Sequence, residues 1–344
     1  MNAKVVASKC LGGEANTGGK MVAPRRNIAA AITLLFVSPL VAEYLLGDLP
    51  LTLLPAMIVL APAYGGAALL IRETARRAGR GWPTMLLLGA AYTLIAEGLA
   101  TQSLFNHDYM RMHMHLLDHA YIPALGIGAW WTLFMFNLHT FWSMGVSIAL
   151  VEALFPSDDE VPWLGWIGDS VVVIVFVLGT AANFSMNLTR NQFIAAHAQL
   201  VSVAALSVLL IVAAFLLPAR RLPKADDRAV PGPWITGAMT FVLGLGVMYT
   251  PPRWGWATVG TLLVIDVFFL AAVTFFSRQA QWSALHTLSL AAGGAAAYGV
   301  HAFTQKPLLG GLVAMRVSNA VLFAVAVWSI WLGVRRVIRC QTGY

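Results

Sequence analysis

Acidic, imidazole and amide side chains stand inside stretches of this chain that are otherwise apolar. Glu97, His139 and Asn183 each lie in a different apolar run. Ionisable groups are costly inside helices of lipid length, and they usually face the interior of a bundle, where they do chemistry. A carboxylate beside an imidazole can activate water as a general base, and an amide can position it or stabilise an oxyanion. We therefore predict Glu97, His139 and Asn183 as catalytic residues.

Helical spacing extends these single residues into polar stripes. Thr101 follows Glu97 by four residues and Asn187 follows Asn183 by four, so each pair shares one face of a helix. Pro39 removes a backbone donor one turn before another acid in the first apolar run, which predicts a kink there. We expect the stripes to converge on a cavity nearer the outer face. The predicted substrate-binding residues are Glu43, Thr101, Asn137 and Asn187.

The composition indicates that lipid surrounds most of the chain. Of 344 residues, 59% are hydrophobic and 11% are charged, whereas a soluble domain has about 25% charged residues. Ten apolar runs are long enough, or nearly so, to cross a bilayer core of about 30 Å. They are residues 27–47, 51–71, 83–105, 125–154, 168–188, 194–217, 234–250, 255–276, 283–303 and 312–334. We predict an all-α, polytopic integral membrane bundle.

Charge placement orients the predicted spans. With the N-terminus in the cytoplasm, most of the 22 Lys and Arg residues fall in inner segments, as the positive-inside rule requires. Both termini are then cytoplasmic, in a plasma membrane of the bacterial type. The net charge of +7 is spread between spans, so we predict the lipid bilayer as the partner and no nucleic acid.

A basic, Pro-rich connector divides the chain. We predict a disordered cytoplasmic tail over 1–26, a six-span bundle with the polar site over 27–217, the cytoplasmic linker over 218–233, a four-span supporting bundle over 234–334 and a basic tail over 335–344. Small-residue runs in the second bundle favour close helix packing. Asp266 and Arg316 are the obvious candidates for an ion pair within it.

The outer loop between the third and fourth spans is rich in histidine and methionine. His115 and His119 have the spacing of a zinc site if the loop is helical, and the methionines interleaved with His113 suit copper(I). The alternative is a loop that rests on lipid headgroups. The predicted metal ligands are His113, His115 and His119, with zinc or copper as the possible cofactor.

The run Ala96–Asn106 resembles a signature of uncharacterised multi-span bacterial membrane proteins. More distantly, the order Glu97, His139, Asn183 resembles the CPBP glutamic intramembrane proteases, relatives of the CAAX prenyl endopeptidase. That family carries Glu-Glu-x-x-x-Arg, Phe-x-x-x-His and His-x-x-x-Asn/Asp on successive spans, but here Ala96 replaces the first Glu. The resemblance implies an intramembrane hydrolase that cleaves a membrane peptide.

Two other functions fit the same residues. Buried acids beside kinked helices could form a proton-coupled secondary transporter of a small molecule. The His/Met loop could instead serve a metal-responsive or assembly protein. The sequence has no phosphate-cradling loop, no Gly-x-Ser-x-Gly elbow, no His-Glu-x-x-His and no dinucleotide fingerprint, which argues against energised pumps and against the common hydrolase and redox folds.

Overall fold

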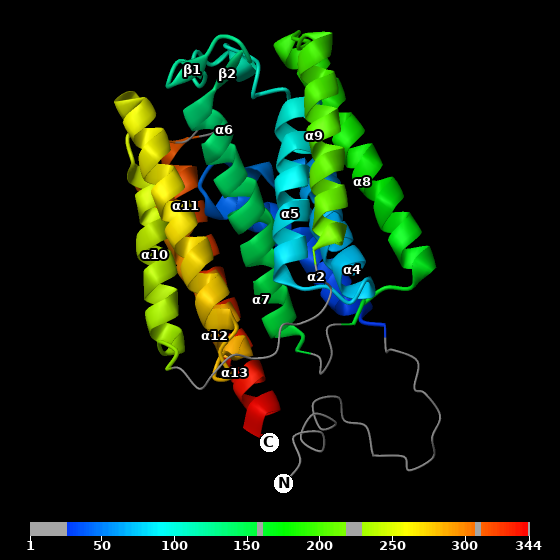
Figure 1. The fold of residues 1–344 in the computed structure, drawn as a ribbon, viewed down its shortest axis with the longest axis vertical. Coiled ribbons are helices and arrows are strands. Elements are labelled where there is room, and N and C mark those ends of the chain that lie inside the picture. The colour runs from blue at the N-terminus through cyan, green and yellow to red at the C-terminus, as the bar shows by residue number, and fades with distance from the viewer. Residues whose placement is uncertain (1–25, 157–160, 218–228, 307–310, 343–344) are drawn as a thin grey trace.

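The computed structural model describes residues 26–156, 161–217, 229–306 and 311–342, and it is a bundle of long helices (Figure 1). Each of the ten predicted apolar runs forms one helix or a chain of helical segments. In order these are α2 (Ile28–Pro39) with η2 (Leu40–Leu45); η3 (Leu51–Ala56), α3 (Met57–Leu60), η4 (Ala61–Gly65) and α4 (Gly66–Arg77); α5 (Trp82–Thr93) with η5 (Leu94–Ala100); α6 (Ala129–Phe136), η7 (Asn137–Val146) and α7 (Ser147–Leu154); α8 (Trp166–Met186) with η8 (Asn187–Asn191); α9 (His197–Leu216); α10 (Pro233–Tyr249); α11 (Trp256–Ser277); α12 (Ala284–Ala302); and α13 (Leu312–Thr342).

The all-α membrane architecture is confirmed. Among the described residues, eight helices are long and apolar enough to cross a membrane, two fewer than the predicted ten. α10 falls short because it has 17 residues. α12 has 19 residues and also stands outside the eight, since glycines, hydroxyl residues and two histidines dilute its apolar content. Both helices nevertheless run alongside α11 and α13 (Figure 1).

Hydrogen bonds between the segments that connect the helices show which helix ends lie together. From these pairings, successive helices run in opposite directions. At one end, the Asn27 N–H donates to Trp163 O at 3.0 Å, and the Arg77 side chain donates to Leu164 O at 2.9 Å. At the other end, Ala195 N–H donates to Gln102 and Tyr249 bonds Thr304, both at 2.7 Å. A short hairpin, β1 (Tyr121–Ile122) with β2 (Ile127–Gly128), marks this second end, called the outer end below (Figure 1).

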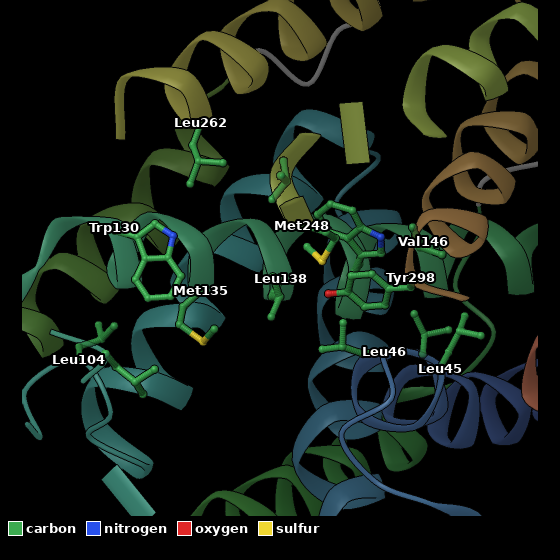
Figure 2. Packing of buried hydrophobic residues seen from close by; sticks show 14 of the residues in the cluster. Leu45, Leu46, Leu104, Trp130, Met135, Leu138, Val146, Met248, Leu262 and Tyr298 are labelled. Carbon is green, nitrogen blue, oxygen red and sulfur yellow. The ribbon is translucent and has the colours of Figure 1, made fainter. Parts of the chain in front are cut away.

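Parts of the predicted domain scheme lie outside the described residues, namely the tail up to residue 25 and most of the linker, 218–228. α13 continues to Thr342, so residues 335–342, predicted as a tail, extend the last helix. The six-span and four-span sets share one hydrophobic core. Trp142 of η7 stacks on Tyr298 of α12 with ring centroids 4.8 Å apart and donates to Gly294 O at 2.9 Å. Figure 2 shows Tyr298 of this core beside Leu46 and Met248.

Small residues hold α10 and α12 together, as the glycine- and alanine-rich run predicts. A Cβ added at Gly293 would lie 2.1 Å from the Gly237 carbonyl oxygen, and one at Gly244 would lie 2.8 Å from the Ala297 Cβ. Neither position has room for a side chain. Glycine at these positions lets the two backbones approach, which gives α12 its central place in the bundle.

We predict that Gly293→Ala destabilises the protein by about 1–3 kcal/mol, because the added methyl group must push α10 and α12 apart. The control is Gly260→Ala on the exposed face of α11, where an added Cβ meets nothing within 4 Å. Thermal unfolding of both variants in one detergent should show a lowered midpoint for Gly293→Ala only. Equal midpoints would contradict this packing.

Candidate functional site

Glu97 and His139 meet inside the bundle. Glu97 Oε1 lies 2.9 Å from His139 Nε2, and the two residues are 6% and 5% exposed. They come from η5 and η7, which belong to the third and fourth spans. The structure therefore brings together two of the three residues predicted to be catalytic.

Hydroxyl groups surround the other carboxylate oxygen of Glu97. Thr101 donates to Oε2 at 3.0 Å, Ser103 donates to the same oxygen, and Trp131 Nε1 donates to the Ser103 hydroxyl at 3.2 Å. Donors of this kind replace the water that an ionised carboxylate loses on burial. Thr101, predicted to bind substrate, thus contacts the Glu97 carboxylate.

A second acid and two tyrosines complete the cluster. The Tyr64 hydroxyl donates to Glu43 Oε1 at 2.5 Å. The rings of Tyr64 and Tyr92 each pack against the His139 ring with centroids 5.6 Å apart. These two carboxylates, two phenols and one imidazole, from the first four spans, are called the acid–base cluster below.

Ser143 lies beside the cluster without the geometry of a nucleophile. Its Oγ is 3.5 Å from His139 Nδ1, at the outer limit of a hydrogen bond, and it donates to Leu138 O at 3.1 Å. The cluster is therefore suited to moving a proton to or from water, rather than to attack by serine.

Four members of the cluster stand on π-helical segments. Glu43 lies on η2, Tyr64 on η4, Glu97 on η5 and His139 on η7. Single π turns inside helices are frequent at functional sites, because they redirect side chains and free backbone groups. Pro39 immediately precedes η2, so a π segment begins where the sequence predicts a kink. At Gly65 a Cβ would meet Leu35 O at 1.9 Å, and this close approach brings Tyr64 to Glu43.

The outer loop covers the cluster. Tyr109, in the short helix η6 (Tyr109–Arg111), hydrogen-bonds Thr101, and burial raises the pKa of its phenol. The loop is tied down at its other side, since Arg111 donates to Gln192 at 2.6 Å. It therefore closes the outer end above Glu97.

The predicted amide residues lie elsewhere. Asn183 is half-buried on α8 and makes no hydrogen bond to Glu97 or His139. Asn187 donates to Phe193 O at 3.2 Å, and Asn137 donates to Asp266 at 3.0 Å. The predicted pair of Asp266 with Arg316 is wrong, since Arg316 donates to the Ala302 carbonyl at 3.0 Å.

The outer-loop histidines point to different partners. His113 pairs with Asp108 at 3.1 Å, His115 pairs with Asp118 at 2.8 Å, and the His119 ring contacts Trp130. The segment around His115 is not helical, so the i,i+4 geometry of the predicted zinc site is not formed. Among the described residues no group of three or more His, Cys, Asp or Glu could hold a metal ion.

A second cluster of buried charged residues lies at the end opposite the outer end, called the inner end below. Contacts within the protein satisfy its charges. Arg72 pairs with Glu73 at 2.6 Å and stacks over the Trp163 ring at 3.6 Å. Glu73 accepts from the backbone N–H groups of Trp163 and Leu164. α4 continues through these residues and turns their charges inward.

Comparison with known proteins agrees with this picture at the level of the family. Residues 32–342 match the family described as "Uncharacterized membrane protein family". The chain belongs to this family. No curated protein and no solved structure matches the chain. Membership covers the acid–base cluster and every described helix except the first turn of α2, and it supports a location in a membrane.

We predict that the half-buried Asp48 makes the protein less stable as the pH rises from about 4 to about 7. Burial, with a smaller contribution from the negative charge of Glu43, raises the pKa of Asp48 to about 7, although a hydrogen bond from Gln305 opposes the rise. An unfolded aspartate has a pKa of about 3.9, so the native state holds the proton more tightly than the unfolded chain over this range.

Asp48→Asn should therefore flatten the dependence of the unfolding midpoint on pH in this window. Asp118→Asn, in the exposed outer loop, is the control for loss of one carboxylate. If Asp48→Asn and wild type kept parallel pH profiles, the assignment would fail.

Proposed function

We propose that this protein is an intramembrane acid–base enzyme of the hydrolase type, acting on a membrane-embedded substrate in a bacterial-type plasma membrane. The observation that carries the proposal is the 2.9 Å contact between Glu97 and His139 inside the bundle. A buried carboxylate–imidazole pair can take a proton from water and return it to a leaving group. If Glu97 and His139 had only structural roles, a separate neighbour could satisfy each of them, and the two would not need to contact each other.

Each residue of the acid–base cluster has a role in this reaction. Glu97 accepts the proton of the attacking water and returns it to the leaving group, and His139 holds the Glu97 carboxylate in place. The phenol of Tyr92 lies against the imidazole and is better placed than Asn183 to donate to a developing oxyanion. Glu43 and Tyr64 form a second proton-holding pair next to His139.

An apolar cavity supports a substrate that arrives from the bilayer. A cavity of about 130 Å³ lies between α4, α5, α8 and α9, and Tyr92 forms part of its wall together with Leu88, Ala91 and Ile211. Its lining is almost entirely apolar, and Ile211 is only half-buried. The hollow is smaller than the about 300–1,000 Å³ of a ligand pocket, so it suits one apolar side chain of a substrate in the bilayer. The distant resemblance to CPBP-type proteases agrees with a peptide substrate.

We predict that Glu97→Gln and His139→Gln abolish turnover, because each removes one partner of the proton-transferring pair. Membranes from cells that express wild type or variant would be compared by sequencing newly formed protein N-termini. We expect a set of membrane-protein N-termini that wild type produces and both variants lack. Asp118→Asn, an exposed acid of the outer loop, is the control and should keep the set. Identical sets for wild type and Glu97→Gln would end the proposal.

A proton-coupled transporter is the second candidate, and the second acid favours it. Glu43 with Tyr64 places a further proton-binding group beside His139, which hydrolysis does not require. Uptake of a small solute into proteoliposomes under a pH gradient, lost in both Glu43→Gln and Glu97→Gln, would select transport over hydrolysis.

A further inference from the structure

Three buried polar atoms gather near the outer end of α12 and α13 without a partner among the described residues. They are the Tyr298 hydroxyl, His301 Nδ1 and Asn319 Oδ1. Tyr298 is 0% exposed and Asn319 is 2% exposed. Leaving a buried polar group unsatisfied costs about 1–3 kcal/mol, so three such atoms together indicate bound water.

The three residues lie on one contiguous surface. Tyr298 and His301 are one helical turn apart on α12. Asn319 reaches the same turn from α13, because its Nδ2 donates to Ala302 O at 2.7 Å. Arg316 donates to the same carbonyl at 3.0 Å and is the cation that faces this region from α13.

Gln305 connects this surface to the outer end of the first span. Its side chain donates to the Asp48 carboxylate and also hydrogen-bonds His301. Asp48 lies three residues after the end of η2, and its backbone N–H donates to Glu43 O at 3.0 Å. Asp48 is half-buried, so part of its surface faces outward, as expected of an entrance.

The surface also reaches the acid–base cluster. Glu43 accepts from Tyr64, whose ring packs on His139. Because the Asp48 N–H donates to Glu43 O, polar groups follow one another from His301 and Gln305 through Asp48 to Glu43, Tyr64 and the buried imidazole.

We propose that a hydrated path runs between η2 and α12, through Asp48, Gln305, His301 and Tyr298, and supplies water and protons from the outer end to Glu43 and the Glu97–His139 pair. Internal waters make about three hydrogen bonds each, and the carboxylates, the phenol, the imidazole and the Asn319 amide offer that number. The path does not depend on which reaction the cluster performs. Its use in hydrolysis rests on the proposed function.

Hydroxyl-radical footprinting tests the path on the wild-type protein in proteoliposomes, without any substrate. Radicals made from water oxidise side chains that contact water, including buried ones. Tyr44 is the matched control: it is also a tyrosine and 0% exposed, but its hydroxyl donates to Leu53 O at 2.8 Å. We expect Tyr298 to be oxidised severalfold faster than Tyr44.

Mixing the protein with ¹⁸O-labelled water shortly before the radical pulse distinguishes a path that exchanges with bulk water from a water molecule trapped inside the protein. The path requires that the oxygen added to Tyr298 carries ¹⁸O as soon as that added to the exposed Met112. Oxidation of Tyr298 at the slow rate of Tyr44, or prompt oxidation without ¹⁸O, would overturn the proposal. Neither result would bear on whether Glu97 is catalytic, so the two proposals can fail separately.

Discussion

The contact between the Glu97 carboxylate and the His139 imidazole is the constraint on which the rest of the structure depends. Moving a charged group out of water costs several kcal/mol even after the protein relaxes, and only a close partner with further hydrogen bonds offsets that cost. Glu97 therefore needs His139 on one oxygen and the hydroxyls of Thr101 and Ser103 on the other. The third and fourth spans can pack in few other ways once this requirement is met.

Irregular backbone segments and small residues allow the spans to bring Glu97 and His139 into contact. A regular helix would carry Glu43, Tyr64, Glu97 and His139 at orientations fixed by 3.6 residues per turn. The π segments η2, η4, η5 and η7 change those orientations where the acid–base cluster forms. Such departures are tolerated in a membrane where protein, rather than lipid, surrounds the backbone. Gly65 provides the close approach that packs η4 against α2.

Much of the fold could be predicted, because hydropathy and charge placement are local properties. All ten apolar runs are helical, and Glu97 and His139 were identifiable since buried ionisable residues must converge. Asn183 and the pair of Asp266 with Arg316 could not be placed, because partner choice depends on helix rotation and on π turns that a 3.6-residue period does not describe. Tyr64 carried a usable signal, as it stands between Pro62 and Gly65, residue types that favour a helix kink. Ser103 lies beyond the helix end, so only the chain reversal brings it to Glu97.

A double-mutant cycle tests most directly whether Glu97 and His139 form one unit. The free energy of unfolding would be measured in one detergent for wild type, Glu97→Gln, His139→Gln and the double variant. Residues that share a buried hydrogen-bonded pair couple by about 0.5–3 kcal/mol, and we predict that the double variant is less destabilised than the sum of the single variants by an energy in this range. Additive effects, within about 0.3–0.5 kcal/mol, would show that each residue is satisfied by unrelated neighbours and would contradict the account.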